Sequence, residues 1–100
     1  MNFVTLKVYT ENTKNKVVNI NDFIVEFDSN RNIFLIENDT ESLSLRFEKG
    51  NVLVLAVFNN VRSLTTLRDL PEHIKNIGAS DMFSAFKASP FYKEKFEVEV

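Results

Sequence analysis

Cysteine and tryptophan are absent from this 100-residue sequence, and glycine and proline occur only twice each. Without cysteine the chain has no disulfide framework, no thiolate nucleophile and no sulfur ligand for a metal. The two glycines stand far apart, so they cannot form a P-loop or a dinucleotide-binding fingerprint, which need glycines at close fixed spacings. Functions that depend on these motifs are therefore excluded.

An excess of positive charge and a long apolar run are also lacking. The net charge is −2 and the isoelectric point is near 5.4, which is unfavourable for binding nucleic acid or an anionic membrane surface. No apolar run approaches the roughly 20 residues of a membrane span, and the first residues do not have the pattern of a signal peptide. We therefore expect a cytoplasmic protein with no membrane partner.

The composition that remains is that of an ordinary globular domain with an unusual number of phenylalanines. Hydrophobic residues make up 44% of the chain, charged residues 26%, and ten residues are Phe. A chain of this length predicts one domain over residues 1–100. Phe adds large buried area with no polar atom to satisfy, so most of these rings should belong to the core. Abundant asparagine and scarce alanine are typical of bacteria with AT-rich genomes and of their phages.

The first 59 residues alternate between apolar and polar positions, which is typical of strands. Short polar turns of hairpin length separate the alternating segments, and such short connections exclude a parallel sheet. The segments predicted as strands are 3–10, 17–27, 33–37, 42–48 and 52–58.

The turn before the last of these strands leaves two registers open. A loop of two residues would pair Phe47 with Val52. A loop of three, with Gly50 in the left-handed conformation, would pair Leu45 with Leu53. We favour the three-residue loop because glycine adopts a positive φ easily and lysine does not.

Both faces of the strand 52–58 are apolar, whereas the strand before it has one polar face. Leaving large aliphatic side chains in water forgoes roughly 1.5–3 kcal/mol each, so we expect this second face to be covered. The candidate cover is a stripe of apolar residues at helical spacing, which consists of Leu64, Leu67, Leu70, Ile74 and Ile77.

Pro71 divides this stripe, because proline inside a helix costs roughly 3 kcal/mol. We therefore predict a short helical turn near 63–68, followed by a helix that Asp69 caps. Glu72 would complete a capping box, and Gly78 would end the helix.

A second helix is predicted over 81–88, with Ser80 as its cap and Ser89-Pro90 as its stop. The last residues, 96–100, alternate again and read as a short terminal strand. The fold class is therefore α+β: a curved antiparallel sheet of about five to six strands, mostly a meander, within 3–59. A helical region within 63–88 packs on one face of that sheet.

Catalytic and metal-binding patterns are not found. Asp69 and His73 have the spacing of two ligands on one helix face, but Asp69 is better placed as a cap and no third ligand is evident. A single histidine and no nucleophile elbow argue against a catalytic triad. We expect no catalytic residue, no metal and no cofactor, and hence a protein that is not an enzyme.

The aromatic C-terminal segment is the candidate protein interface, because aromatics and methionine are enriched at interface centres. Phe83, Phe86 and Phe96 have the spacing of core residues. Phe91 and Tyr92 follow a proline without clear periodicity, so we expect both to be at least partly exposed. The predicted contact residues are Met82, Phe91, Tyr92, Lys93 and Lys95.

The function expected from the sequence is a small protein-binding module, of the kind that phages and mobile elements use to modulate or inhibit a host protein. A first alternative is a structural or assembly subunit that self-associates, for instance as a homodimer, through its terminal strand or an open sheet face. A second is single-stranded nucleic-acid binding on a Phe-rich sheet. The polar face of the predicted strand 42–48 has one positive charge, so nucleic acid is the less favoured partner.

Overall fold

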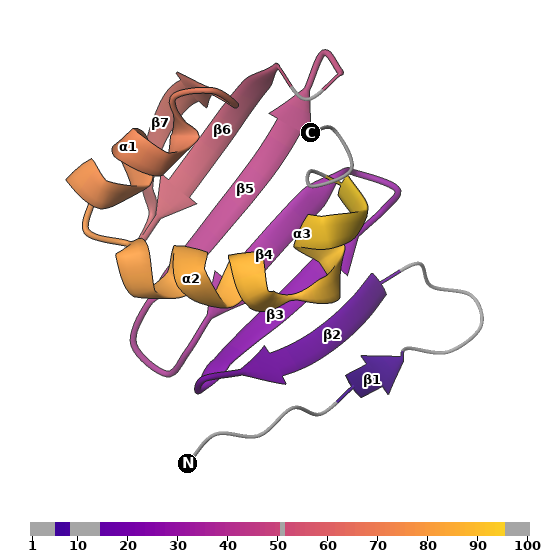
Figure 1. Cartoon of the computed structure of the whole chain (residues 1–100). Helices are drawn as coiled ribbons and strands as arrows, with labels where there is room; N and C mark the ends of the chain where they lie inside the picture. The colour runs from indigo at the N-terminus through magenta and orange to yellow at the C-terminus, as the bar shows by residue number, and fades with distance from the viewer. Residues whose placement is uncertain (1–5, 9–14, 51, 96–100) are drawn as a thin grey trace.

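The described part of the chain forms a seven-stranded antiparallel sheet followed by three helices (Figure 1). The computed structural model describes residues 6–8, 15–50 and 52–95. The strands are β1 (Leu6–Val8), β2 (Asn15–Ile20), β3 (Phe23–Asp28), β4 (Ile33–Glu37), β5 (Ser42–Glu48), β6 (Leu53–Phe58) and β7 (Val61–Thr66). The helices are α1 (Leu70–Asn76), α2 (Ser80–Ala88) and α3 (Pro90–Lys95). Strand order follows the chain from β1 to β7, so the sheet is a meander, and the predicted α+β class is confirmed.

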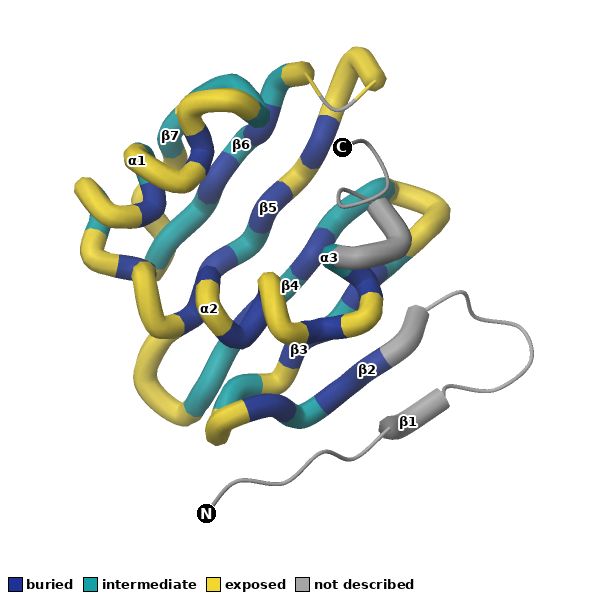
Figure 2. The backbone as a smooth tube through the Cα atoms, viewed as in Figure 1, coloured by how far each residue is buried: buried dark blue, intermediate teal, exposed yellow. Residues whose placement is uncertain are grey.

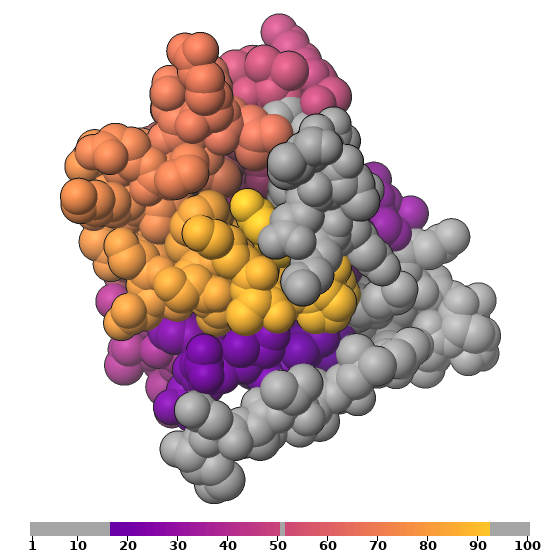
Figure 3. Space-filling model, viewed as in Figure 1, coloured from indigo at the N-terminus to yellow at the C-terminus, as the bar shows by residue number. Residues whose placement is uncertain are grey.

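The described helices lie on the same face of the sheet, and their apolar sides form one core with it (Figure 1). The space-filling view in Figure 3 shows this face, where the atoms of α1 and α2 cover most of the strands beneath them. Figure 2 shows buried positions alternating along β3 to β6, as expected when only one face of each strand meets the helices. The strand residues of this core include Val25, Phe34, Ile36, Leu43, Leu45, Val54 and Ala56, all 0% exposed.

A cluster of aromatic rings holds α2 and α3 against β3, β4 and β5. The Phe34 ring stacks on Phe27 with centroids 4.4 Å apart and meets the edge of Phe47 at 5.6 Å. From the helices, Phe86 approaches Phe34 at 4.7 Å, and Phe91 approaches Phe27 at 6.0 Å. Offset and edge-to-face aromatic pairs add about 0.5–1.5 kcal/mol each to the area that they bury. The expectation that Phe83 and Phe86 belong to the core is confirmed, whereas Phe96 lies outside the described residues.

Two tight hairpins depend on polar residues in the left-handed conformation. Asn21 and Asp22 have φ values of 52° and 71°, and Asn59 and Asn60 have 49° and 72°. Each pair forms a two-residue loop, since the residues that flank it pair directly across the strands. Two successive positive φ values are typical of the type I′ turn, which matches the twist of a hairpin. The first of these turns divides the predicted strand 17–27 into β2 and β3.

The helical turn that we predicted near 63–68 is not found, because the second of these turns leads into a strand. The chain reverses at Asn59-Asn60 and continues as β7, which pairs with β6 along its whole length. Valine and two threonines favour a strand there because β-branched side chains fit a pleated surface well. Leu64 therefore belongs to the sheet, Leu67 lies in the turn that follows, and the helical part of the stripe begins only at Leu70.

The β5–β6 register differs from both of the alternatives considered. Phe47 pairs with Val54, and Leu45 pairs with Ala56. The loop has four residues, and the Val52 N–H donates to the Glu48 carbonyl at 3.1 Å. Lys49 has a φ of 54°, so the argument that lysine would avoid a positive φ was wrong. The pairing of β5 with β6 requires this backbone conformation in the loop, and it outweighs the preference of lysine for a negative φ.

The helix ends follow the predicted signals with small differences. Asp69 is the N-cap of α1 and Pro71 lies in its first turn, but the Asp69 side chain makes no capping hydrogen bond. At the other end Gly78, with φ 77°, donates to the Lys75 carbonyl and Ala79 to the Ile74 carbonyl. These two bonds form a Schellman motif, which ends the helix at the predicted glycine.

The second helix begins one residue earlier than predicted, at Ser80, with Ala79 in the cap position. It stops at Ser89 as predicted. Pro90 then starts α3, a helix that the sequence pattern did not indicate. The predicted terminal strand 96–100 lies outside the described residues, as do both ends of the predicted strand 3–10, within which the structure has β1.

The aromatic cluster predicts a large loss of stability when its central ring is removed. Phe34→Ala should lower the free energy of unfolding by about 3–5 kcal/mol, because it deletes a fully buried ring and leaves a cavity. Urea denaturation followed by circular dichroism measures this. Val61→Ala, at a residue 69% exposed, is the control and should change the free energy by less than about 0.5 kcal/mol. Equal effects of the two substitutions would contradict this core.

The β6–β7 turn predicts opposite effects of two substitutions at one position. Asn60→Gly should raise the free energy of unfolding by roughly 0.5 kcal/mol, because glycine adopts φ 72° without steric cost. Asn60→Val should lower it by about 1–2 kcal/mol, because a branched side chain opposes the left-handed conformation. Thermal unfolding of both variants would show the split, and a fall for both would refute the turn assignment.

Candidate interaction surface

The described helices do not cover the second face of β3 to β7. They pack on the side that carries Val54 and Ala56, whereas Leu53, Leu55 and Val57 point to the other side of β6. The prediction that the stripe from Leu64 to Ile77 covers this second face is therefore wrong. Its helical members pack on the face that already belongs to the core. We call the helix-free side of β3 to β7 the open face.

Seven large aliphatic side chains lie on the open face. Two of them are strongly exposed, Leu64 at 72% and Ile24 at 40%. The others are partly exposed side by side, so that they shield one another but not fully. The seven are Ile24, Ile33, Leu35, Leu53, Leu55, Val57 and Leu64. Scattered exposed leucines are ordinary, but a contiguous apolar patch marks an interaction site.

Strand pairing arranges five of these residues, together with charged and polar neighbours, in two parallel rows across the open face. The first row passes through Ser44 on β5 and consists of Arg62, Val57, Ser44, Leu35 and Glu26. The second row passes through Arg46 and consists of Leu64, Leu55, Arg46, Ile33 and Asp28. Residues that pair directly are about 5 Å apart, so each row is a continuous strip of contacting side chains.

Charge is divided unevenly between the two sides of the face. Arg62 stands on β7 and Arg46 on β5, whereas Glu26 and Asp28 stand on β3. At the β3 side these carboxylates line a hollow of about 240 Å³ together with Arg31, Ile33 and Leu35. Such a hollow has an apolar wall and a rim that holds two carboxylates and one arginine. It is suited to the aliphatic stem and cationic end of an arginine or lysine side chain.

Two local ion pairs accompany these charges. Arg46 Nε lies 3.5 Å from a carboxylate oxygen of Glu48, and Arg31 Nε lies 3.4 Å from Asp28. All four side chains keep partial or full solvent access, so each pair contributes at most about 1 kcal/mol to stability. The charges therefore bear more on what the face attracts than on the stability of the fold.

The predicted C-terminal interface is mostly part of the core. Met82 is 1% exposed and Phe91 is 3% exposed, so the expectation that Phe91 would be partly exposed is wrong. The reason is α3, which turns the Phe91 ring back toward Phe27 on the sheet. Tyr92 is half-buried, with its ring against the edge of Phe86 at 5.4 Å. Lys93 and Lys95 belong to α3, and contact of these residues with a partner stays a prediction.

The structure brings the single histidine to a serine on the edge strand. Ser63 Oγ lies 2.7 Å from His73 Nε2, which ties α1 to β7. Ser63 Oγ also lies 3.4 Å from the Ala56 carbonyl oxygen. Within the described ranges no carboxylate bonds to His73, so the pair lacks the third group that orients a catalytic histidine. The arrangement is that of a structural tie, and the sequence had no signal for it because the residues belong to different elements.

Polar turn residues line a second hollow, of about 310 Å³, between the end of β4 and the start of β5. Asn38 Oδ1 accepts hydrogen bonds from the Thr40 and Glu41 backbone N–H groups, which shapes this turn. Across the part of the chain that is described, no group of histidine, aspartate and glutamate side chains could hold a metal ion. The described helices are all too short or too polar to cross a membrane.

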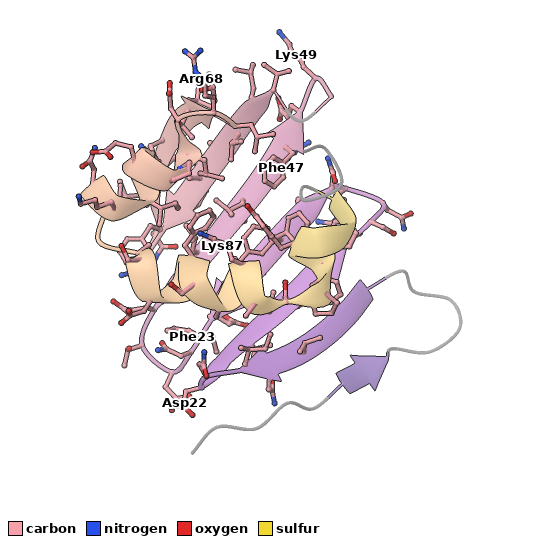
Figure 4. The ribbon with its side chains drawn as sticks, viewed as in Figure 1. Asp22, Phe23, Phe47, Lys49, Arg68 and Lys87 are labelled. Carbon is pink, nitrogen blue, oxygen red and sulfur yellow. The ribbon has the colours of Figure 1, made fainter. Side chains whose placement is uncertain are left out.

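The phenylalanine rings of the sheet lie on the helix-covered side. Phe23 and Phe47, labelled in Figure 4, point from the strands toward the helices, and Phe58 also packs against the core. A platform for single-stranded nucleic acid needs rings on a solvent-facing surface. Such rings are missing from the described open face, so this geometry does not support that alternative.

Comparisons with protein-family models, with curated proteins and with solved structures found no significant match to this chain.

The serine–histidine contact predicts a measurable coupling energy. Ser63→Ala and His73→Ala should each lower the free energy of unfolding by about 1 kcal/mol, because either change removes the hydrogen bond between α1 and β7. The double variant should lose less than the sum, with a coupling of about 0.5–1.5 kcal/mol. Chemical denaturation of the four proteins gives the cycle. Strict additivity would show that the contact is not formed.

Proposed function

We propose that this chain is a non-enzymatic protein-binding module and that it binds through the open face. The observation that carries the proposal is the set of seven aliphatic side chains on the open face. All three described helices pack on the opposite face, so none of them covers these side chains. Covering leucine and isoleucine side chains that are in contact with water lowers the free energy, so a partner that covers them binds favourably.

The chemistry of the open face indicates the kind of partner. Aliphatic residues of β4, β6 and β7 lie on both sides of the polar strand β5, and charged residues stand on β5, β7 and β3. Protein interfaces combine apolar and charged residues in this way. The hollow beside Glu26 and Asp28 adds a position for a basic side chain of the partner. The partner is therefore a protein surface with exposed aliphatic residues and at least one cationic side chain.

This proposal moves the interface away from the aromatic C-terminal segment. Phe91 and Met82 hold the helices on the sheet, so they act on binding only by keeping the sheet folded. A modulator of a host protein and an assembly subunit would both use the open face, because seven aliphatic side chains lie there at least partly exposed.

A photocrosslinking experiment tests the proposal with a matched control. Val61 and Leu64 both lie on the edge strand β7, with exposures of 69% and 72%, but they point to opposite sides of the sheet. A benzophenone amino acid at position 64 should form protein adducts on irradiation in cells that express the chain. The same probe at position 61 should form few. Adducts of equal yield at both positions, or none at position 64, would overturn the proposed function.

A further inference from the structure

The row through Ser44 on the open face is complementary to itself, and this points to a partner for the face. The row through Ser44 reads cation, aliphatic, serine, aliphatic, anion from one side to the other, as Arg62, Val57, Ser44, Leu35 and Glu26. Its apolar character is symmetric about Ser44, and its charge is reversed across it. This is the pattern that an isologous interface requires, where each patch meets its own copy.

We infer that two copies of this chain bind face to face through their open faces, about a two-fold axis that runs parallel to β5. This inference rests on the proposed function and names its partner as a second copy. Rotation about that axis places Val57 over Leu35 of the second copy. It also brings Arg62 to Glu26 of the second copy, beside the hollow that Glu26 lines.

The inner positions of the second row fit the same axis, whereas its ends bring Leu64 to Asp28 of the second copy. Leu55 and Ile33 flank Arg46 at equal distances in the register, so rotation brings Leu55 over Ile33 of the second copy. Arg46 lies near the axis and is bound to Glu48 at 3.5 Å. Two such ion pairs then lie side by side, so that neither arginine meets an uncompensated like charge.

The size of the face is sufficient for a dimer. Five strands spaced about 4.8 Å apart, each about 20 Å long, present roughly 400–500 Å² in projection. Two such faces with protruding side chains would bury on the order of 1,000–1,200 Å² of accessible surface, where specific interfaces begin. Packed sheets lie about 10 Å apart with their strands within about 30° of each other, which an axis along β5 allows. We therefore expect a dimer of moderate affinity that dissociates on dilution.

The mass in solution is the first test. The full chain of 11.6 kDa should elute as a species of twice that mass in size exclusion with light scattering, and should approach the single-chain mass on dilution. Leu64→Asp should shift the protein to the single-chain mass, because it places a carboxylate on the apolar face opposite Asp28 of the second copy. Val61→Asp, on the other side of the same strand, should leave the dimer intact.

A charge exchange tests the axis itself. Arg62→Glu and Glu26→Arg should each raise the dimer dissociation constant roughly tenfold, because each replaces two attractive pairs with two repulsive ones. The double variant Arg62→Glu/Glu26→Arg should recover the dimer, since the opposed charges are restored. Arg68→Glu is the matched control, because Arg68 is exposed and projects from the end of the sheet (Figure 4). Circular dichroism of each variant confirms that it is folded.

The outcomes separate this inference from the proposed function. A single-chain mass at every concentration, with position-64 crosslinks to a different protein, would overturn the dimer and leave the binding module intact. A dimer that Leu64→Asp does not weaken would show that another surface, such as the free edge of β7, joins the copies. A dimer that the double exchange fails to restore would overturn the axis along β5. Weak dimers in both single variants and a restored dimer in the double variant would support the pairing of Arg62 with Glu26.

Discussion

The structure depends on the packing of a short helical segment against one side of a wide sheet. The three helices span residues 70–95, and their apolar side chains meet strands from both halves of the sheet in one cluster. Phe34 stands at the centre of this contact, between rings from two neighbouring strands and from α2. A sheet of seven strands has two faces, and these helices are sufficient to cover only one of them.

That constraint links the core to the proposed function. Because the helices pack on the side of Val54 and Ala56, the aliphatic residues on the opposite side of β6 remain in contact with water. They would be unusual choices for a surface whose only requirement is solubility, where polar residues alternate with the buried ones. β5 follows that rule with Ser42, Ser44 and Arg46, whereas β4 and β6 do not. The polar strand thus lies between two apolar ones, and this spacing makes the row through Ser44 complementary to itself.

The hairpin turns determine which residues reach the open face. A shift of one residue in a hairpin exchanges the two faces of every following strand. The four-residue loop after Glu48 places the even-numbered residues of β6 in the core, whereas the three-residue loop would have placed the odd-numbered ones there. The two-residue turn at Asn59-Asn60 then fixes the register of β7, so that Arg62 and Leu64 lie on the open face. Lys49 adopts a positive φ, so its local preference yielded to the pairing of the strands that it joins, whereas Asn60 follows the preference of asparagine for the left-handed conformation.

The sequence by itself determined the fold class, the position of most strands, the stop of α1 at Gly78 and the break at Ser89-Pro90. These features depend on local signals, since alternation, helical spacing and residues with special backbone conformations act within a few positions. It also showed that both faces of β6 are apolar. Only the tertiary structure decided which face the helices cover, that Phe91 is buried while Leu64 is exposed, and that Ser63 meets His73. Those outcomes follow from strand register and from contacts between residues distant in the chain, and no local pattern encodes either.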